Sequence, residues 1–184
     1  MLAALGKAVG PGTPDSMPDK ITYGSYELVC FHEARHAETA IQLGSRVEKI
    51  TIFDNADGPN GKCTIEGFPL HRPHICLGGF AAELSPFQAQ RLLNRDGSPV
   101  DERQFVQALM RNATEDRRRF IALQFGLHLS PDDEISGELD RKFMAFAQGR
   151  AENNMSPAAV ERIAAAFKGR RELSGAEVHA AYQG

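Results

Sequence analysis

Apolar residues recur along this chain at two different spacings, and each spacing predicts a type of secondary structure. Between Tyr26 and Leu43, apolar and small residues return every three or four positions, which is the period of one helix face. Ser25 precedes this stretch as an N-cap, and Gly44 follows it as a C-terminal stop. We therefore expect a helix over 26–43.

The spacing changes to that of a strand after this helix. Residues 47–53 alternate in the manner of a strand, and a second short strand is expected over 62–68. The residues between them, 54–61, are rich in Asp, Asn, Gly and Pro, which favour turns. Together these segments predict a β-hairpin with a long tip.

The rest of the chain is expected to be helical, which makes the fold class mainly α with a small β element (α+β). Helices are expected from Pro73, from Ser98 on toward Gly126, and over 132–148, 157–167 and 175–182. Gly78 and Gly79 in the first of these indicate that another backbone packs closely there. Ser174 and Glu177 form a capping box at the last helix. The charge run 115–119 is interpreted as a solvated helix face.

Length and composition then limit the domain organisation and the partners. With 184 residues, the chain is expected to form one domain over 21–184 behind a flexible N-terminal leader at 1–20. The net charge of −3 gives no electrostatic drive toward nucleic acid. The three cysteines include no CxxC pair, which favours free thiols and a cytoplasmic location. No apolar run reaches the ~18–20 residues of a membrane span.

The predicted first helix carries an HExxH motif, His32-Glu33-Ala34-Arg35-His36. Residues four apart on a helix lie one turn above each other, so both imidazoles can reach one metal ion. Glu33 lies on the same broad face, where it is placed to take a proton from a metal-bound water rather than to bind the metal. Because zinc lowers the pKa of such a water toward ~7, the motif predicts a hydrolytic Zn²⁺ site.

The third ligand of such a site is not defined by spacing. A catalytic zinc takes three protein ligands and keeps one position for water. Gln42 stands where the third histidine of an extended HExxHxxGxxH motif would be. The downstream candidates that composition and spacing leave open are His71, His74, Glu83, Asp101, His128 and His179.

Four segments in order resemble the FtsH-like metallopeptidases, the protease half of membrane-anchored AAA proteases. They are FHEARHA at 31–37, VEKITI at 47–52, LGGFAAEL at 77–84 and LSGAEV at 173–178. In the family they correspond to an FHEAGHA-type motif, the strand after its helix, an LGGRAAEEL segment and a closing L-(T/S)-G-E-E-(I/V) helix. The resemblance extends from about Tyr23 to the C-terminus.

The resemblance implies a mostly helical zinc endopeptidase domain, with HExxH on its first helix and a β-hairpin beside it. In the family, an aspartate at the start of the helix after LGGRAAEEL is the third zinc ligand. Asp101 occupies that place, so the implied ligands are His32, His36 and Asp101, with Glu33 as the catalytic base. Glu83 is expected to hydrogen-bond a zinc-bound histidine and fix its tautomer, with direct ligation by Glu83 as the alternative.

This chain also departs from the family pattern. Arg35 replaces the glycine usual inside HExxH and is expected to point away from the metal, where it could close off neighbouring space or meet an acidic partner. Phe80 replaces the arginine of the GGRAAE pattern. The 184 residues contain no GxxxxGK[ST] phosphate loop.

We therefore expect a peptidase that acts without an ATPase of its own on peptides or unfolded proteins, or with a separate ATPase partner. The edge of strand 47–53 is expected to pair with an extended substrate. Monomer, dimer and hexamer all remain open, so a homo-oligomer is one of the expected states. The alternative function is a catalytically inactive, metal-binding regulatory or interaction module with the same fold.

Overall fold

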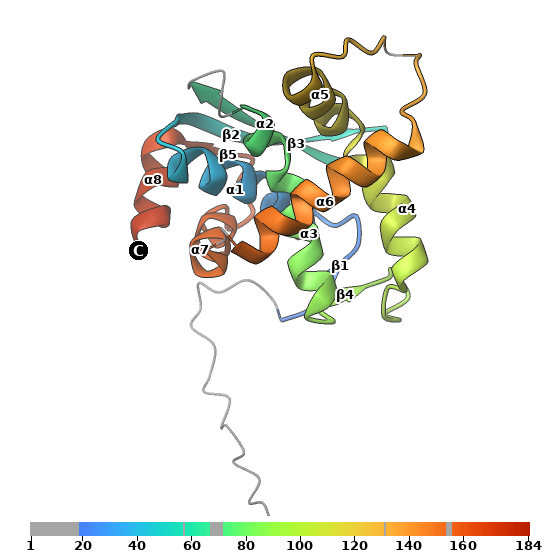
Figure 1. Cartoon of the computed structure of the whole chain (residues 1–184). Helices are drawn as coiled ribbons and strands as arrows, with labels where there is room; N and C mark the ends of the chain where they lie inside the picture. The colour runs from blue at the N-terminus through green and yellow to red at the C-terminus, as the bar shows by residue number, and fades with distance from the viewer. Residues whose placement is uncertain (1–18, 57, 67–71, 131, 154–155) are drawn as a thin grey trace, which may run out of the picture.

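Helices make up most of this chain, and a small sheet covers one side of the first long helix (Figure 1). The computed structural model describes residues 19–184 except 57, 67–71, 131 and 154–155, so the expected leader lies almost wholly outside the described residues. The elements are β1 Ile21–Thr22, α1 Tyr26–Gln42, β2 Arg46–Asn55, β3 Gly58–Glu66, α2 Arg72–Cys76, α3 Gly78–Gln88, β4 Leu92–Leu93, α4 Glu102–Asn112, α5 Thr114–Phe125, α6 Gly137–Asn153, α7 Pro157–Ala166, β5 Glu172–Ser174 and α8 Gly175–Gln183. The expected mainly helical α+β class is confirmed.

Helix α1 packs against elements from both halves of the chain. The Ser25 side chain accepts a hydrogen bond from the backbone N–H of Leu28, as its N-cap position predicts. The helix ends at Gln42, and Gly44 follows with a left-handed φ of 75°. It packs against α3, α7 and the hairpin, so every residue from Leu28 to Ala40 is fully or partly buried.

The sheet has the strand order β3-β2-β5, with β2 antiparallel to both neighbours. The hairpin is longer than expected and its tip is short, because Asn55 already pairs with Gly58. The predicted long tip over 54–61 is therefore wrong, and most of that segment continues the two strands. β2 is the central strand, so among the described strands the outer edges of this sheet belong to β3 and β5 and not to the stretch 47–53.

The second half differs from the expected helices mainly at their boundaries. The helix expected from Pro73 is two helices, α2 and α3. The helix expected from Ser98 begins only at Glu102, where Asp101 is the N-cap, and it breaks at Ala113 into α4 and α5. The capping box that begins α8 is confirmed, since the Ser174 and Glu177 side chains each accept from the other's backbone N–H.

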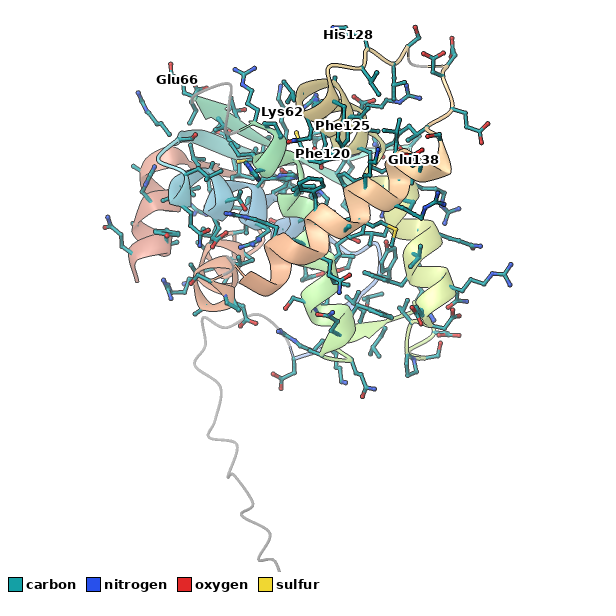
Figure 2. All side chains as sticks on the ribbon, viewed as in Figure 1. Lys62, Glu66, Phe120, Phe125, His128 and Glu138 are labelled. Carbon is teal, nitrogen blue, oxygen red and sulfur yellow. The ribbon has the colours of Figure 1, made fainter. Side chains whose placement is uncertain are left out.

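One contiguous apolar core joins these elements. Figure 2 shows the Phe120 ring between α5 and α6, where it makes edge-to-face contacts with Phe125 and Phe143. The three cysteines are free thiols, as expected. Across the described part of the chain, no helix is both long and apolar enough to span a bilayer.

Candidate metal centre

The two histidines and the glutamate of the HExxH motif lie on one side of α1, in the interior of the molecule. His32 and His36 are one turn apart, and their ring centroids are 4.9 Å from each other. His36 and Glu33 are each 6% exposed, while the His32 side chain is 15% exposed. Two imidazoles and a carboxyl group are therefore held close together with little access for water.

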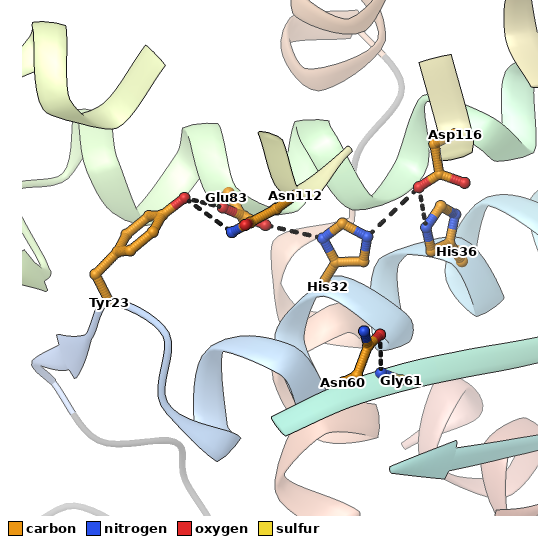
Figure 3. A network of polar contacts seen from close by, with 8 residues as sticks. All are labelled: Tyr23, His32, His36, Asn60, Gly61, Glu83, Asn112 and Asp116. Atoms are coloured by element: carbon orange, nitrogen blue, oxygen red, sulfur yellow. Dashed lines mark hydrogen bonds and ion pairs between the residues drawn. The ribbon is translucent and has the colours of Figure 1, made fainter. Parts of the chain in front are cut away.

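A third group reaches these histidines from the first turn of α5. One oxygen of Asp116, Oδ2, lies 3.1 Å from Nε2 of His36 and 3.5 Å from Nε2 of His32. Figure 3 shows both rings directed at this oxygen. One ligand atom from each of the three residues lies within 4.8 Å of the other two, a spacing that could hold a metal ion.

Asp101, the aspartate expected as third ligand, lies elsewhere. It is exposed, and its Oδ1 accepts the backbone N–H of Gln104 at 2.9 Å, so its task in this structure is to cap α4. The structure brings Asp116 to the histidines in its place. The interpretation of 115–119 as a solvated face is wrong for Asp116 and for Arg117, which is 9% exposed and ion-paired with Asp140.

The other candidate histidines that the structure describes are not part of this cluster. His71 lies outside the described residues. His74 lines a separate pocket of about 380 Å³ between the end of α1 and α6, which includes no residue of the cluster. His128 lies in the exposed loop after α5 (Figure 2), and His179 lies on α8.

The inner nitrogen of each imidazole has a hydrogen-bond acceptor. Nδ1 of His36 lies 2.7 Å from the backbone carbonyl oxygen of Ile75, in α2. Nδ1 of His32 lies 2.9 Å from Oε1 of Glu83, in α3. A carbonyl oxygen only accepts, so the hydrogen of neutral His36 is on Nδ1 and its Nε2 carries a lone pair. The hydrogen bond expected between Glu83 and a motif histidine is present.

This arrangement tests whether the site suits a metal ion. Nε2 of a neutral His36 and Oδ2 of Asp116 are both acceptors, and two acceptors 3.1 Å apart repel unless a proton or a cation lies between them. Zinc coordinates imidazole nitrogen together with carboxylate oxygen. In metal sites the other ring nitrogen usually donates to a carboxylate or a carbonyl, as both Nδ1 atoms do here. The donor set therefore fits a divalent cation such as Zn²⁺.

Three glycines make room for the site. Gly78 allows α3 to approach α1, because a Cβ there would lie 3.1 Å from the backbone of Arg35 and His36. A side chain at Gly79 would overlap the His32 ring, and one at Gly61 in β3 would overlap Glu33. The close backbone approach that Gly78 and Gly79 predict is confirmed, and it brings Glu83, one turn further along α3, to His32.

Burial and charge both shift the pKa values in this site. For Asp116, burial raises the pKa, but the charge of His36 and hydrogen bonds with both imidazoles bring it well below its usual range. Burial lowers the pKa of His36, but the charge of Asp116 and its hydrogen bond to the imidazole together outweigh that effect and raise the pKa. The pKa of Glu33 is raised, because burial outweighs the opposing charges of His36 and His32. A carboxyl group so placed can hold a proton nearer to neutral pH.

Arg35 points away from the histidines, into the opposite side of α1. Its guanidinium is 0% exposed and forms an ion pair with Glu38, one turn along the same helix. The departure from the family's glycine therefore leaves the three potential ligands free of steric interference. Searches with this chain found no matching family model and no matching curated protein.

Proposed function

We propose that this chain is a zinc-dependent metallopeptidase of the FtsH-like type. His32, His36 and Asp116 would hold the metal, and Glu33 would act as the general base. The observation that carries the proposal is the convergence of two Nε2 atoms and one carboxylate oxygen beside a buried glutamate. Asp116 replaces Asp101 in the proposed ligand set because, of these two aspartates, Asp116 is the one that contacts the histidines.

The chain's own groups support a hydrolytic role for this site. Zinc bound there would supply a Lewis acid that lowers the pKa of a coordinated water toward ~7. Glu33 follows His32 directly, and its raised pKa suits a carboxylate that takes a proton from water and passes it to the amine leaving group. Glu83 and the Ile75 carbonyl hold the two imidazoles in the orientation that directs Nε2 inward.

The outer edge of β3 supports an extended peptide as substrate. Among the described strands, β3 pairs only with β2, so its other edge is open to a further strand. Gly61 in β3 packs directly against Glu33, so this strand lies beside the proposed site. A peptide that adds to an open edge forms main-chain hydrogen bonds that do not depend on its sequence. The substrate class that fits is therefore an extended peptide or unfolded protein segment.

The close packing of β3 on Glu33 also favours a second candidate function. Gly61 leaves no room for even one added carbon beside Glu33, and the backbone of Cys63 hydrogen-bonds the same carboxyl group. A site closed in this way would suit a metal-binding regulatory or interaction module without turnover. The two functions differ in whether Glu33 is needed for peptide cleavage.

Substitution of Glu33 by Gln tests the choice between them. Glu33→Gln keeps the shape and removes the base, and it is expected to lower the cleavage rate of unfolded casein and of a peptide library by about 10²–10⁴-fold. Glu27→Gln, an exposed substitution on the same helix, is the matched control and should cleave at the wild-type rate. Zinc content, measured by mass spectrometry, should be equal in all three proteins. Equal cleavage by wild type and Glu33→Gln would favour the module.

A further inference from the structure

A chain of hydrogen bonds extends from the candidate metal centre to residues at the end of β1 and at the end of α4. The hydroxyl of Tyr23 lies 3.1 Å from Oε2 of Glu83, whose other oxygen faces His32. The side-chain amide of Asn112 donates to the same hydroxyl oxygen at 3.3 Å. Figure 3 shows Asn112, Tyr23, Glu83 and His32 joined in this order, ahead of Asp116 and His36.

The available donors and acceptors allow only one direction of donation along this chain of hydrogen bonds. Asn112 donates to the Tyr23 oxygen, which leaves the Tyr23 proton to donate to Glu83. The carboxylate of Glu83 then accepts one hydrogen bond on each oxygen, from Tyr23 and from Nδ1 of His32. Burial and the neighbouring charge of Glu83 raise the pKa of Tyr23 far above its usual value, so the hydroxyl keeps its proton at any working pH.

Elements that are far from one another in the sequence hold Tyr23 and Asn112, the residues at the outer end of the hydrogen-bond chain. Tyr23 directly follows β1, which pairs in parallel with β4, and its backbone N–H donates to the Leu93 carbonyl at 2.7 Å. Asn112 is the last residue of α4. The Glu83 side chain is only 3% exposed, so water offers few alternative partners for it. The β1–β4 pair and the end of α4 thus limit how that carboxylate can turn.

We propose that Tyr23 and Asn112 are positioning residues of the metal centre, which hold the Glu83 carboxylate in place and, through it, the tautomer and orientation of His32. This inference rests on the proposed zinc site. It assigns a task to the short β1–β4 pair and to the C-terminal end of α4. Partners of this kind around metal-bound histidines typically change metal affinity by 10–100-fold when removed. Because Tyr23 acts through Glu83, we expect the lower end of that range.

The test compares two tyrosines that each lose only a hydroxyl. Tyr23→Phe removes the donor to Glu83, whereas Tyr26→Phe removes a donor to the backbone carbonyl of Arg170, away from the site. Zinc affinity is measured by competition with a chromogenic chelator. We expect affinity about tenfold weaker in Tyr23→Phe and unchanged in Tyr26→Phe. In a Glu83→Gln background, Tyr23→Phe should cause no further loss.

A second measurement needs no metal. The Nδ1–H of His32, observed by NMR in metal-free protein, should exchange with water several-fold faster in Tyr23→Phe than in wild type or Tyr26→Phe. If wild type binds zinc and both tyrosine variants bind it equally, the positioning role is overturned and the proposed function stands. If wild type binds no zinc, the proposed function fails, and the positioning role is then judged by the exchange rate of the His32 Nδ1–H alone. Faster exchange in Tyr23→Phe supports that role, and equal exchange overturns it.

Discussion

The two sides of helix α1 both bury charged groups, but they arrange donors and acceptors in opposite ways. On one side, His32 and His36 direct Nε2 atoms at a carboxylate oxygen of Asp116, so acceptors converge. On the other side, donors converge on the Glu38 carboxylate. They come from Arg35, Thr39, Gln42 and the backbone N–H of Ser156.

This difference distinguishes a binding site from a structural ion pair. Converging acceptors are stable only with a proton or a cation between them, so the histidine side of α1 has a place for a ligand. A carboxylate surrounded by donors is already satisfied, so the Glu38 carboxylate ties α1 to the start of α7 and needs no cation. Both sides of α1 bury charged groups. They differ in whether acceptors face other acceptors, as on the histidine side, or donors face an acceptor, as around Glu38.

The largest effect is expected on the structural side. Glu38→Gln would leave the Arg35 guanidinium, which is 0% exposed, without a counter-charge. Removal of one partner of a buried ion pair typically costs about 3–5 kcal/mol. We expect a loss of that size in the free energy of unfolding, measured with urea. Zinc affinity should stay within about twofold of wild type.

A double variant provides the control for this prediction. Replacement of both partners, Arg35→Met with Glu38→Leu, removes the two charges together and should recover most of the lost stability. If Glu38→Gln is as stable as wild type, or weakens zinc binding strongly, then the two sides of α1 are not separate in the way the hydrogen bonds indicate.

The next effect is expected on the histidine side. Asp116→Asn replaces an anionic ligand by a neutral amide, and we expect zinc affinity to fall by at least about 100-fold. Asp101→Asn is the matched control, because Asn is an equally good N-cap and should leave zinc affinity unchanged. The reverse result, a loss in Asp101→Asn alone, would restore the ligand that the family resemblance implies. Chelator competition measures both variants.

The sequence pointed to Asp101 as the third ligand, but the structure brings Asp116 to the histidines. This difference shows which part of the site the sequence could not predict. The HExxH helix was predictable because its cap, its period and its two histidines all lie within one continuous stretch. Asp116 lies in a run of five charged residues, and local pattern favours a solvated face for such a run. Asp116 lies in the first turn of α5, directly after the break between α4 and α5 at Ala113, and it faces histidines that lie far earlier in the sequence.

The supporting groups were predictable to different degrees. Gly78 and Gly79 indicated close backbone packing without naming the partner, and the family resemblance pointed to Glu83. The β1–β4 pair is two residues long in each strand, and β5 is three, so neither has enough alternation to be recognised. Tyr23 enters the site through that short pair, and no local pattern marks it.

The smallest effect is expected at Glu177, a carboxylate that is surrounded by donors, as Glu38 is, but is exposed to water. Glu177 accepts hydrogen bonds from the Ser174 backbone N–H at 2.8 Å, the Ser174 hydroxyl at 2.7 Å and Arg170 at 2.7 Å. Its pattern matches that of Glu38, but solvent screens the charges. Ser174→Ala is therefore expected to cost only about 1 kcal/mol, as for other N-caps.

Acid should weaken this cap in a defined pH window. The hydrogen bonds from Arg170 and Ser174 lower the pKa of Glu177 from 4.5 to about 2. A depressed carboxyl pKa gives a contribution that is fully present above pH 4.5 and is lost as the pH falls toward 2. We expect the α8 amides to exchange with solvent faster at pH 2 than at pH 5, after correction for intrinsic rates. In Glu177→Gln this pH dependence should be reduced, because an amide does not titrate. If the variant keeps it in full, acid acts on α8 through another group, and the donor pattern around Glu177 does not govern the stability of this helix as it does around Glu38.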